Sequence, residues 1–215
     1  MTSVVAELRG LVPVRPLTNS EAMRVAELQA TRLLKLAGVA QPPLPEGVIG
    51  ALPRIRVERS SPIPVSGSAQ WAKGVWHVVL NGAEPLVRQR FSLAHEFKHV
   101  LDAPFASFLY PEVLGMDSHD RGERVADYFA GCLLMPKLWI NRTWTSGEQR
   151  LPGLARRFGV SQAAMQVRLL QIGLIDPPAR CRGLLRNTST NHRRHLYFRE
   201  APAIAMPSGR AKEVA

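Results

Sequence analysis

Residues 90–102, which read RFSLAHEFKHVLD, decide the fold of this chain, and they contain an H-E-x-x-H motif. On an α-helix this spacing places His95 and His99 one turn apart on one face, and Glu96 lies beside them. Two neutral imidazoles so placed bind one divalent cation together. The other side of the helix is an apolar stripe, formed by Leu93, Ala94, Phe97, Val100 and Leu101. One helix therefore offers one face to a core and the other to a metal site.

A third metal ligand has to come from elsewhere, because a catalytic zinc site keeps three protein ligands and one open position. The metzincin pattern would place Gly and then His after the motif, but Asp102 and Phe105 stand there. Glu123 instead begins a Glu-x-x-x-Asp pair in a predicted helix over residues 123–134, and Asp127 lies about 40° from it on the helical wheel. This is the gluzincin arrangement, in which the Glu binds the metal and the residue one turn later orients a ligand histidine.

The neighbouring residues leave several roles open. His119 and Asp120 are alternative ligands, since they precede the same helix. Glu96 is the predicted general base, because it lies beside the ligands and is not one of them. Tyr110, Tyr128 and His119 are the candidates for stabilising an oxyanion, and the sequence does not choose among them. Peptide hydrolysis is the reaction class that this set of residues predicts.

Composition places the chain among globular proteins. Its 215 residues, of which 46% are hydrophobic, suffice for one domain with a core. No apolar run has the length of a signal peptide or of a membrane span, so we expect a cytoplasmic protein without a membrane partner. The cysteines, Cys132 and Cys181, show no disulfide spacing, and Cys132 is predicted to be a core residue. The absence of a disulfide pattern is consistent with a protein of a reducing compartment.

The net charge of +11 is concentrated near the end of the chain. Residues 177–215 contain eight basic and two acidic side chains, a net of +6, and we expect a flexible basic tail there. Such a tail suits either contact with DNA or a solvated terminus.

The hydrophobic periodicity of the rest of the chain predicts an α+β domain that is mostly helical. Residues 1–18 have no clear period and are expected to be an extended lead-in. A helix should begin at an N-cap on Asn19 or Ser20 and stop at Gly38. Strand-like runs at residues 55–58 and 76–80 predict a small antiparallel sheet, with turns at Gly67 and Gly74.

Residues 151–176 form a separate helical module in this interpretation. Ser161 suits a helix N-cap, and the segment is similar to a helix-turn-helix. The helix that would read DNA carries Arg168 as its one cation, which is little for neutralising phosphates. Packing or substrate docking is therefore favoured over DNA binding.

The chain resembles the ImmA/IrrE family of metallopeptidases. The resemblance lies in R-x-R-F-S-L-A-H-E-x-x-H at residues 88–99, in E-x-x-A-D-x-F-A-x-x-L-L-M-P at residues 123–136, in P-x-S-G at residues 64–67, in the strand at residues 76–81, and in residues 154–169. Two positions depart from the family pattern. Lys98 stands where Gly is usual and is expected to border the cleft, and Asp127 replaces the usual Asn. Neither change removes a predicted ligand or the base.

This resemblance implies a zinc-dependent endopeptidase that cleaves a helix-turn-helix (XRE-type) repressor and so relieves repression of a mobile element or a stress regulon. The alternative is a DNA-binding or protein-binding regulator with a vestigial or structural metal site. Manganese is an alternative to zinc, because the same ligands bind either ion. The expected division is a lead-in (1–18), a zincin-like domain (19–150), a helix-turn-helix-like module (151–176) and a basic tail (177–215). The scissile bond, the activating signal and the oligomeric state are left open.

Overall fold

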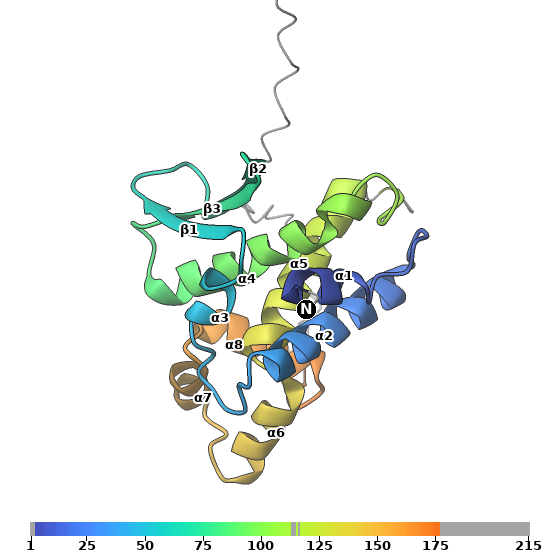
Figure 1. Ribbon diagram of the computed structural model, residues 1–215. Coiled ribbons are helices and arrows are strands. Elements are labelled where there is room, and N and C mark those ends of the chain that lie inside the picture. Colours follow the sequence, from blue (N-terminus) through green and yellow to red (C-terminus); the bar gives the residue numbers. More distant parts are fainter. Residues whose placement is uncertain (1–2, 113–114, 116, 177–215) are drawn as a thin grey trace, which may run out of the picture.

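A computed structural model describes residues 3–112, 115 and 117–176 of the chain. It is an α+β structure in which helices predominate and a small sheet covers one side of a central helix (Figure 1). In chain order the elements are α1 (Val4–Arg9), α2 (Asn19–Leu36), α3 (Gly47–Gly50), β1 (Ile55–Ser60), β2 (Gly67–Ala72), β3 (Val75–Asn81), α4 (Leu86–Asp102), the 3₁₀ turn η1 (Ala103–Phe105), α5 (Ser118–Leu134), α6 (Lys137–Thr145), α7 (Leu151–Phe158) and α8 (Gln162–Gln171).

Helix α4, which carries the H-E-x-x-H motif, lies at the centre of the molecule. Strands β2 and β3 pack on one of its sides and α5 on another, and α5 in turn packs against α2. The predicted apolar stripe is buried, and Phe97, Val100 and Leu101 are fully covered. Because α4 is surrounded in this way, its histidine face is held between α5 and the sheet.

The sheet has the strand order β1-β3-β2, and the prediction of an antiparallel sheet is wrong in part. β2 and β3 form an antiparallel hairpin, but β1 runs parallel to β3. β1 ends beside Asn81 and β2 begins beside Leu80, so residues 61–66 cross the end of β3 and join strands on its two sides. This short crossing makes β1 antiparallel to β2 and hence parallel to β3.

Two glycines lie at the ends of β2, a strand that is not among those predicted from the sequence. Gly74 lies in the hairpin turn with φ +79°, as expected, and Lys73 before it also has a positive φ. Two successive residues in the left-handed region are typical of the tight turns that join antiparallel strands. Gly67 is not a turn residue; it opens strand β2.

The N-terminal segment is not an extended lead-in. Val4–Arg9 form α1, which is capped by Ser3, and Leu8 is completely buried. Arg9 donates hydrogen bonds to two backbone carbonyl oxygens of α4, that of Val100 at 2.7 Å and that of Leu101 at 3.3 Å. Six residues are too few to show a helical period, so only tertiary packing makes this helix recognisable.

Two other helix starts differ from expectation. The N-cap of α2 is Thr18, one residue before Asn19, and it forms a capping box with Glu21. Helix α5 begins at Ser118 and not near Glu123, because Asp117 caps it by accepting a hydrogen bond from the Asp120 backbone N–H. The predicted ends of α2 before Gly38 and of α5 before Pro136 are confirmed.

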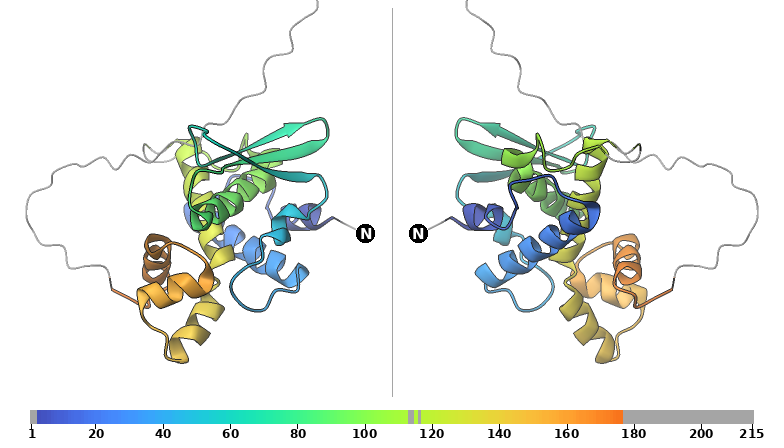
Figure 2. Two further views of the ribbon diagram at one scale, coloured as in Figure 1. Left: turned by 90° about the vertical axis from the view of Figure 1, so that its left-hand side faces the viewer. Right: turned by 90° about the vertical axis from the view of Figure 1, so that its right-hand side faces the viewer.

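Helices α6, α7 and α8 lie together at the end of the molecule opposite the sheet (Figure 2). α7 ends at Gly159, which has φ +65°, and Ser161 caps α8 as expected. The helix-turn-helix interpretation of these elements stays a prediction, and so does the division into domains. The basic tail, residues 177–215, lies outside the described residues. Within the described part of the chain, no helix combines the length and the apolar character that a membrane crossing requires.

Candidate metal centre

His95, His99 and Glu123 come together between α4 and α5. They form the group of potential metal ligands in the described part of the chain, and their ligand atoms lie within 4.8 Å of one another. The Nε2 atoms of His95 and His99 are 3.0 Å apart. Glu123 faces both of them, with carboxylate oxygens 3.4 Å from His95 Nε2 and 3.2 Å from His99 Nε2.

The site lies where α4 packs against α5. Glu123 is in the second turn of α5, and its side chain is 21% exposed, whereas that of His95 is 2% exposed. Starting α5 at Ser118 instead of near Glu123 provides the ordered turn from which Glu123 projects. His119 and Asp120 are not members of the group of ligands in the described residues.

Asp127 lies within hydrogen-bond distance of His95. Its Oδ1 lies 2.8 Å from His95 Nδ1. A proton on Nδ1, donated to this carboxylate, leaves the lone pair of Nε2 directed at His99 and Glu123. Asp127 therefore stands where its predicted role requires, although that role stays a prediction.

The two histidines and the carboxylates of this cluster shift one another's pKa. Burial lowers the pKa of His95, but hydrogen bonds to Asp127 and Glu123 outweigh it and raise that pKa to about 9. Burial lowers the pKa of His99. Burial also raises the pKa of Glu123, but the two histidines dominate and hold it well below its usual range.

These residues fit a divalent metal. The Nε2 atoms of the two imidazoles are 3.0 Å apart, and both face the Glu123 carboxylate. Such a buried polar arrangement is stable only when a proton or a metal cation lies between these atoms. The donor set of two nitrogens and one carboxylate oxygen is that of a catalytic zinc site, and it leaves a fourth position for water.

Glu96 lies beside the group, against the edge of the sheet. It is 1% exposed. A Cβ atom on Gly67 would lie 3.1 Å from Glu96 Cγ and 3.3 Å from its Oε1. The sequence predicts a turn at Gly67, but the lack of a side chain at this residue is what lets β2 pack closely against Glu96. The P-x-S-G sequence at residues 64–67 was the signal that could have indicated this contact.

Lys98 does not border the cleft. It is 1% exposed, and its Nζ lies 2.5 Å from Asp102 Oδ1. The Tyr110 hydroxyl donates a hydrogen bond to Asp102 Oδ2 over 2.5 Å, so both carboxylate oxygens are occupied. Burial lowers the pKa of Lys98 and Asp102 opposes that shift. The lysine is therefore accommodated in the core, away from the histidine face.

This buried ion pair predicts a large loss of stability for Asp102→Ala. Removing one partner of a buried pair leaves the other charge uncompensated, which costs about 3–5 kcal/mol. Lys98→Met/Asp102→Ala should lose less, because no buried charge remains. Urea denaturation of the wild type and both variants measures this, and equal stability of the single and double variants would contradict it.

Two of the oxyanion candidates are engaged elsewhere. Tyr110 is buried and bound to Asp102. Tyr128 lies under the guanidinium group of Arg168, whose Cζ is 5.4 Å from the ring centroid. The third candidate, His119 at the start of α5, is exposed, and its role as oxyanion stabiliser stays a prediction.

The prediction that Cys132 is a core residue is confirmed, because its side chain is 3% exposed.

Asp127→Ala is expected to weaken zinc binding about 10–100-fold, as the loss of a partner that orients a ligand histidine usually does. Asp127→Asn should retain most of the affinity, since its amide oxygen accepts the same hydrogen bond. Competition with a chromogenic chelator gives both constants. If Asp127→Ala bound zinc as tightly as the wild type, Asp127 would have no orienting role.

Comparison with solved structures finds a Mycobacterium tuberculosis transcriptional regulator with a TM-score of 0.56 and 18% sequence identity. The match covers 79% of this chain and 52% of that one, so this chain spans about half the length of the regulator. At this identity the likeness shows the fold alone. No curated protein matches the chain.

Residues 54–170 match the family model of the IrrE N-terminal-like domain, peptidase family M78. This range is more than half of the chain and includes the H-E-x-x-H helix, Glu123, α6, α7 and α8 except for its last residue. The resemblance stated from the sequence is confirmed, and the chain belongs to the ImmA/IrrE family of IrrE N-terminal-like domains.

Proposed function

We propose that this protein is a zinc-dependent endopeptidase that cuts a helix-turn-helix repressor at a specific site. The observation that carries the proposal is the convergence of His95, His99 and Glu123 within 4.8 Å, next to the buried Glu96. Membership of a peptidase family supports hydrolysis as the reaction. The repressor as substrate rests on the family resemblance, and we expect the reaction in the cytoplasm.

Each residue of the candidate site has a separate role in the proposed reaction. His95, His99 and Glu123 would hold the metal, and Asp127 would fix the orientation of His95 through Nδ1. When bound, zinc supplies Lewis acidity, which brings the pKa of a water molecule towards neutrality. Glu96 takes a proton from the attacking water on its carboxylate and delivers it to the leaving amine. The packing of β2 against Glu96 keeps that carboxylate in place through the absence of a side chain at Gly67.

The test uses a candidate helix-turn-helix repressor, chosen first among any such regulators encoded beside this gene. The zinc-loaded full-length protein should convert it into two fragments, and mass spectrometry should find one cleaved bond. Removing zinc with a chelator should stop the cleavage, and restoring zinc should restart it. A repressor that stays intact with zinc-loaded protein, while the protein binds one DNA sequence in preference to others, would favour the alternative of a regulator with a structural metal site.

A further inference from the structure

The positive charge of the chain is distributed unevenly between the metal centre and the C-terminal helices. Residues 1–136 contain fourteen basic and thirteen acidic side chains, a net of +1. Residues 137–176, which include α6, α7 and α8, contain six basic and two acidic side chains, a net of +4. The segment that follows adds +6. The excess charge therefore belongs to the C-terminal part of the protein and not to the metal centre.

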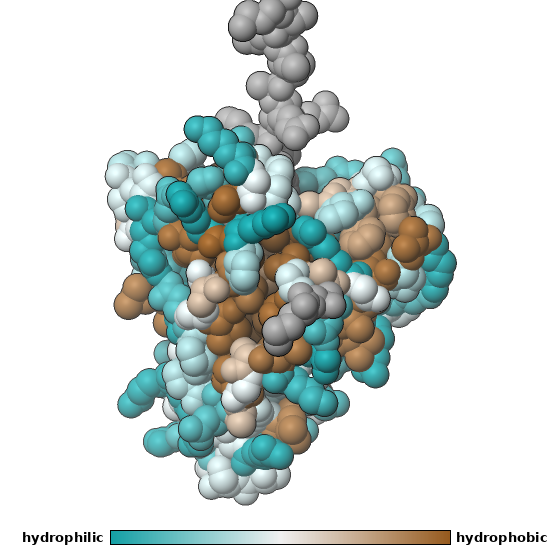
Figure 3. Space-filling model, viewed as in Figure 1, coloured by the Kyte–Doolittle hydropathy of each residue, from teal (hydrophilic) through white to brown (hydrophobic). Residues whose placement is uncertain are grey.

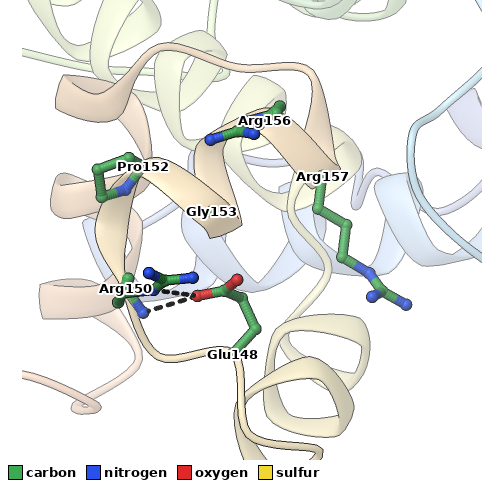
Figure 4. Close-up of a pocket in the computed structure, with 6 residues that line it drawn as sticks. All are labelled: Glu148, Arg150, Pro152, Gly153, Arg156 and Arg157. Atoms are coloured by element: carbon green, nitrogen blue, oxygen red, sulfur yellow. Dashed lines mark hydrogen bonds and ion pairs between the residues drawn. The ribbon is translucent and has the colours of Figure 1, made fainter.

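Three arginines of this region are among the residues that line one surface hollow of about 420 Å³ (Figure 4). Its lining is formed by Glu148, Arg150, Pro152, Gly153, Arg156 and Arg157. All three arginines are exposed. The end of the molecule at which Figure 1 places α6 is mainly hydrophilic in Figure 3, and α6 adds the exposed Lys137 and Arg142.

One carboxylate already lies in this hollow. Glu148 Oε1 is 3.6 Å from Arg150 Nε and accepts a hydrogen bond of 3.0 Å from the Arg150 backbone N–H. A Cβ atom on Gly153 would lie 2.3 Å from the Glu148 carboxyl carbon, so the glycine makes room for it. Within the residues that the structure describes, Arg156 and Arg157 have no acidic partner. The hollow thus accommodates an oxyanion, and the two guanidinium groups of Arg156 and Arg157 on its lining have no acidic partner among the described residues.

The arrangement suits phosphate groups of a duplex better than bases. Arg168, the cation on α8, is 2% exposed and donates a hydrogen bond to the Met135 carbonyl oxygen, so it does not reach a base edge. Recognition of single strands relies on exposed aromatic rings for stacking. Trp139 and Phe158 are buried and Trp144 is half-buried, so α6 and α7 offer no such platform. Guanidinium groups, in contrast, bind phosphate oxygens in a bidentate manner.

We propose that the hollow formed by Arg150, Arg156 and Arg157 binds the phosphate backbone of duplex DNA without reading its sequence. This surface differs from the α8 contact that a helix-turn-helix would use, and it does not depend on the peptidase reaction. Glu148 acts as an internal competitor for the phosphate at Arg150, because its carboxylate is paired with that arginine. Binding is therefore electrostatic and weakens as salt is added.

The experiment measures fluorescence anisotropy of a labelled 20-base-pair duplex of arbitrary sequence with the full-length protein, over a series of salt concentrations. Arg156→Ala/Arg157→Ala should bind about tenfold more weakly near 0.1 M salt, and the slope of log K against log salt should fall by about 2. Glu148→Gln should bind several-fold more tightly, since the amide retains the oxygen that accepts the Arg150 N–H and removes the competing charge.

The matched control is Lys35→Ala/Arg56→Ala, which removes two exposed positive charges from α2 and β1. It should leave the salt slope unchanged, and thermal unfolding should show that all variants fold. Equal losses in the two double variants would overturn the proposal, because overall charge or the residues after 176 would then account for binding. A loss of polyglutamate binding as large as the loss of DNA binding would also overturn it, in favour of an acidic protein partner.

Discussion

Glu96→Gln should abolish cleavage of the repressor while leaving the zinc content of the protein unchanged. A positioned general acid or base contributes about 10²–10⁴-fold to a reaction rate, and the amide cannot take up the proton. The change preserves the size of a side chain that is 1% exposed and in close contact with Gly67, so packing should persist. The measurement pairs the cleavage rate, followed by gel densitometry, with zinc analysis by mass spectrometry.

The control for this prediction is Glu58→Gln, the same substitution on an exposed residue of β1. It should cleave at the wild-type rate. If Glu96→Gln also cleaved at that rate while keeping its zinc, Glu96 would not be the base. Loss of zinc in Glu96→Gln would instead assign this residue to the ligand set.

Glu123→Ala should bind zinc at least about 100-fold more weakly than the wild type. Loss of a residue that only orients a ligand costs up to about 100-fold, so loss of a direct ligand should cost at least that much. The two histidines would remain 3.0 Å apart with no carboxylate opposite them. Isothermal titration of the metal-free protein with zinc measures the change.

Asp120→Ala is a suitable comparison, because Asp120 is an exposed acidic residue one turn earlier on α5 and is outside the ligand group. Its zinc affinity should equal that of the wild type. Undiminished zinc binding in Glu123→Ala would exclude Glu123 as the third ligand. Weakened binding in Asp120→Ala would restore the alternative that the start of α5 takes part in the site.

Much of the candidate site follows from local periodicity. The H-E-x-x-H spacing places His95 and His99 on one face of any helix, and the helix at Leu86–Asp102 is long enough to make that face certain. The same reasoning puts Glu123 and Asp127 on one face of α5. What periodicity cannot give is the distance between two helices. The 2.8 Å contact between His95 and Asp127 joins residues 32 positions apart and exists only because α4 packs on α5.

Features that depend on packing were predicted less well. The parallel pairing of β1 with β3 follows from the path of residues 61–66, which strand propensity does not describe. Lys98 was expected at the edge of the cleft because helical position alone does not specify depth. Its burial is decided by Asp102 on the same helix and by Tyr110, which a loop brings to the other carboxylate oxygen.

The sequence by itself therefore determined the α+β class, the two helices that carry the metal-binding pattern and the family to which the chain belongs. These properties are local, because residue spacing sets which side chains share a helical face. Only the tertiary structure decided that α1 is part of the core, that Gly67 lies against Glu96, and that Arg150, Arg156 and Arg157 share one hollow. Those relations depend on how surfaces far apart in the chain pack together, since burial of apolar area is not tied to sequence order.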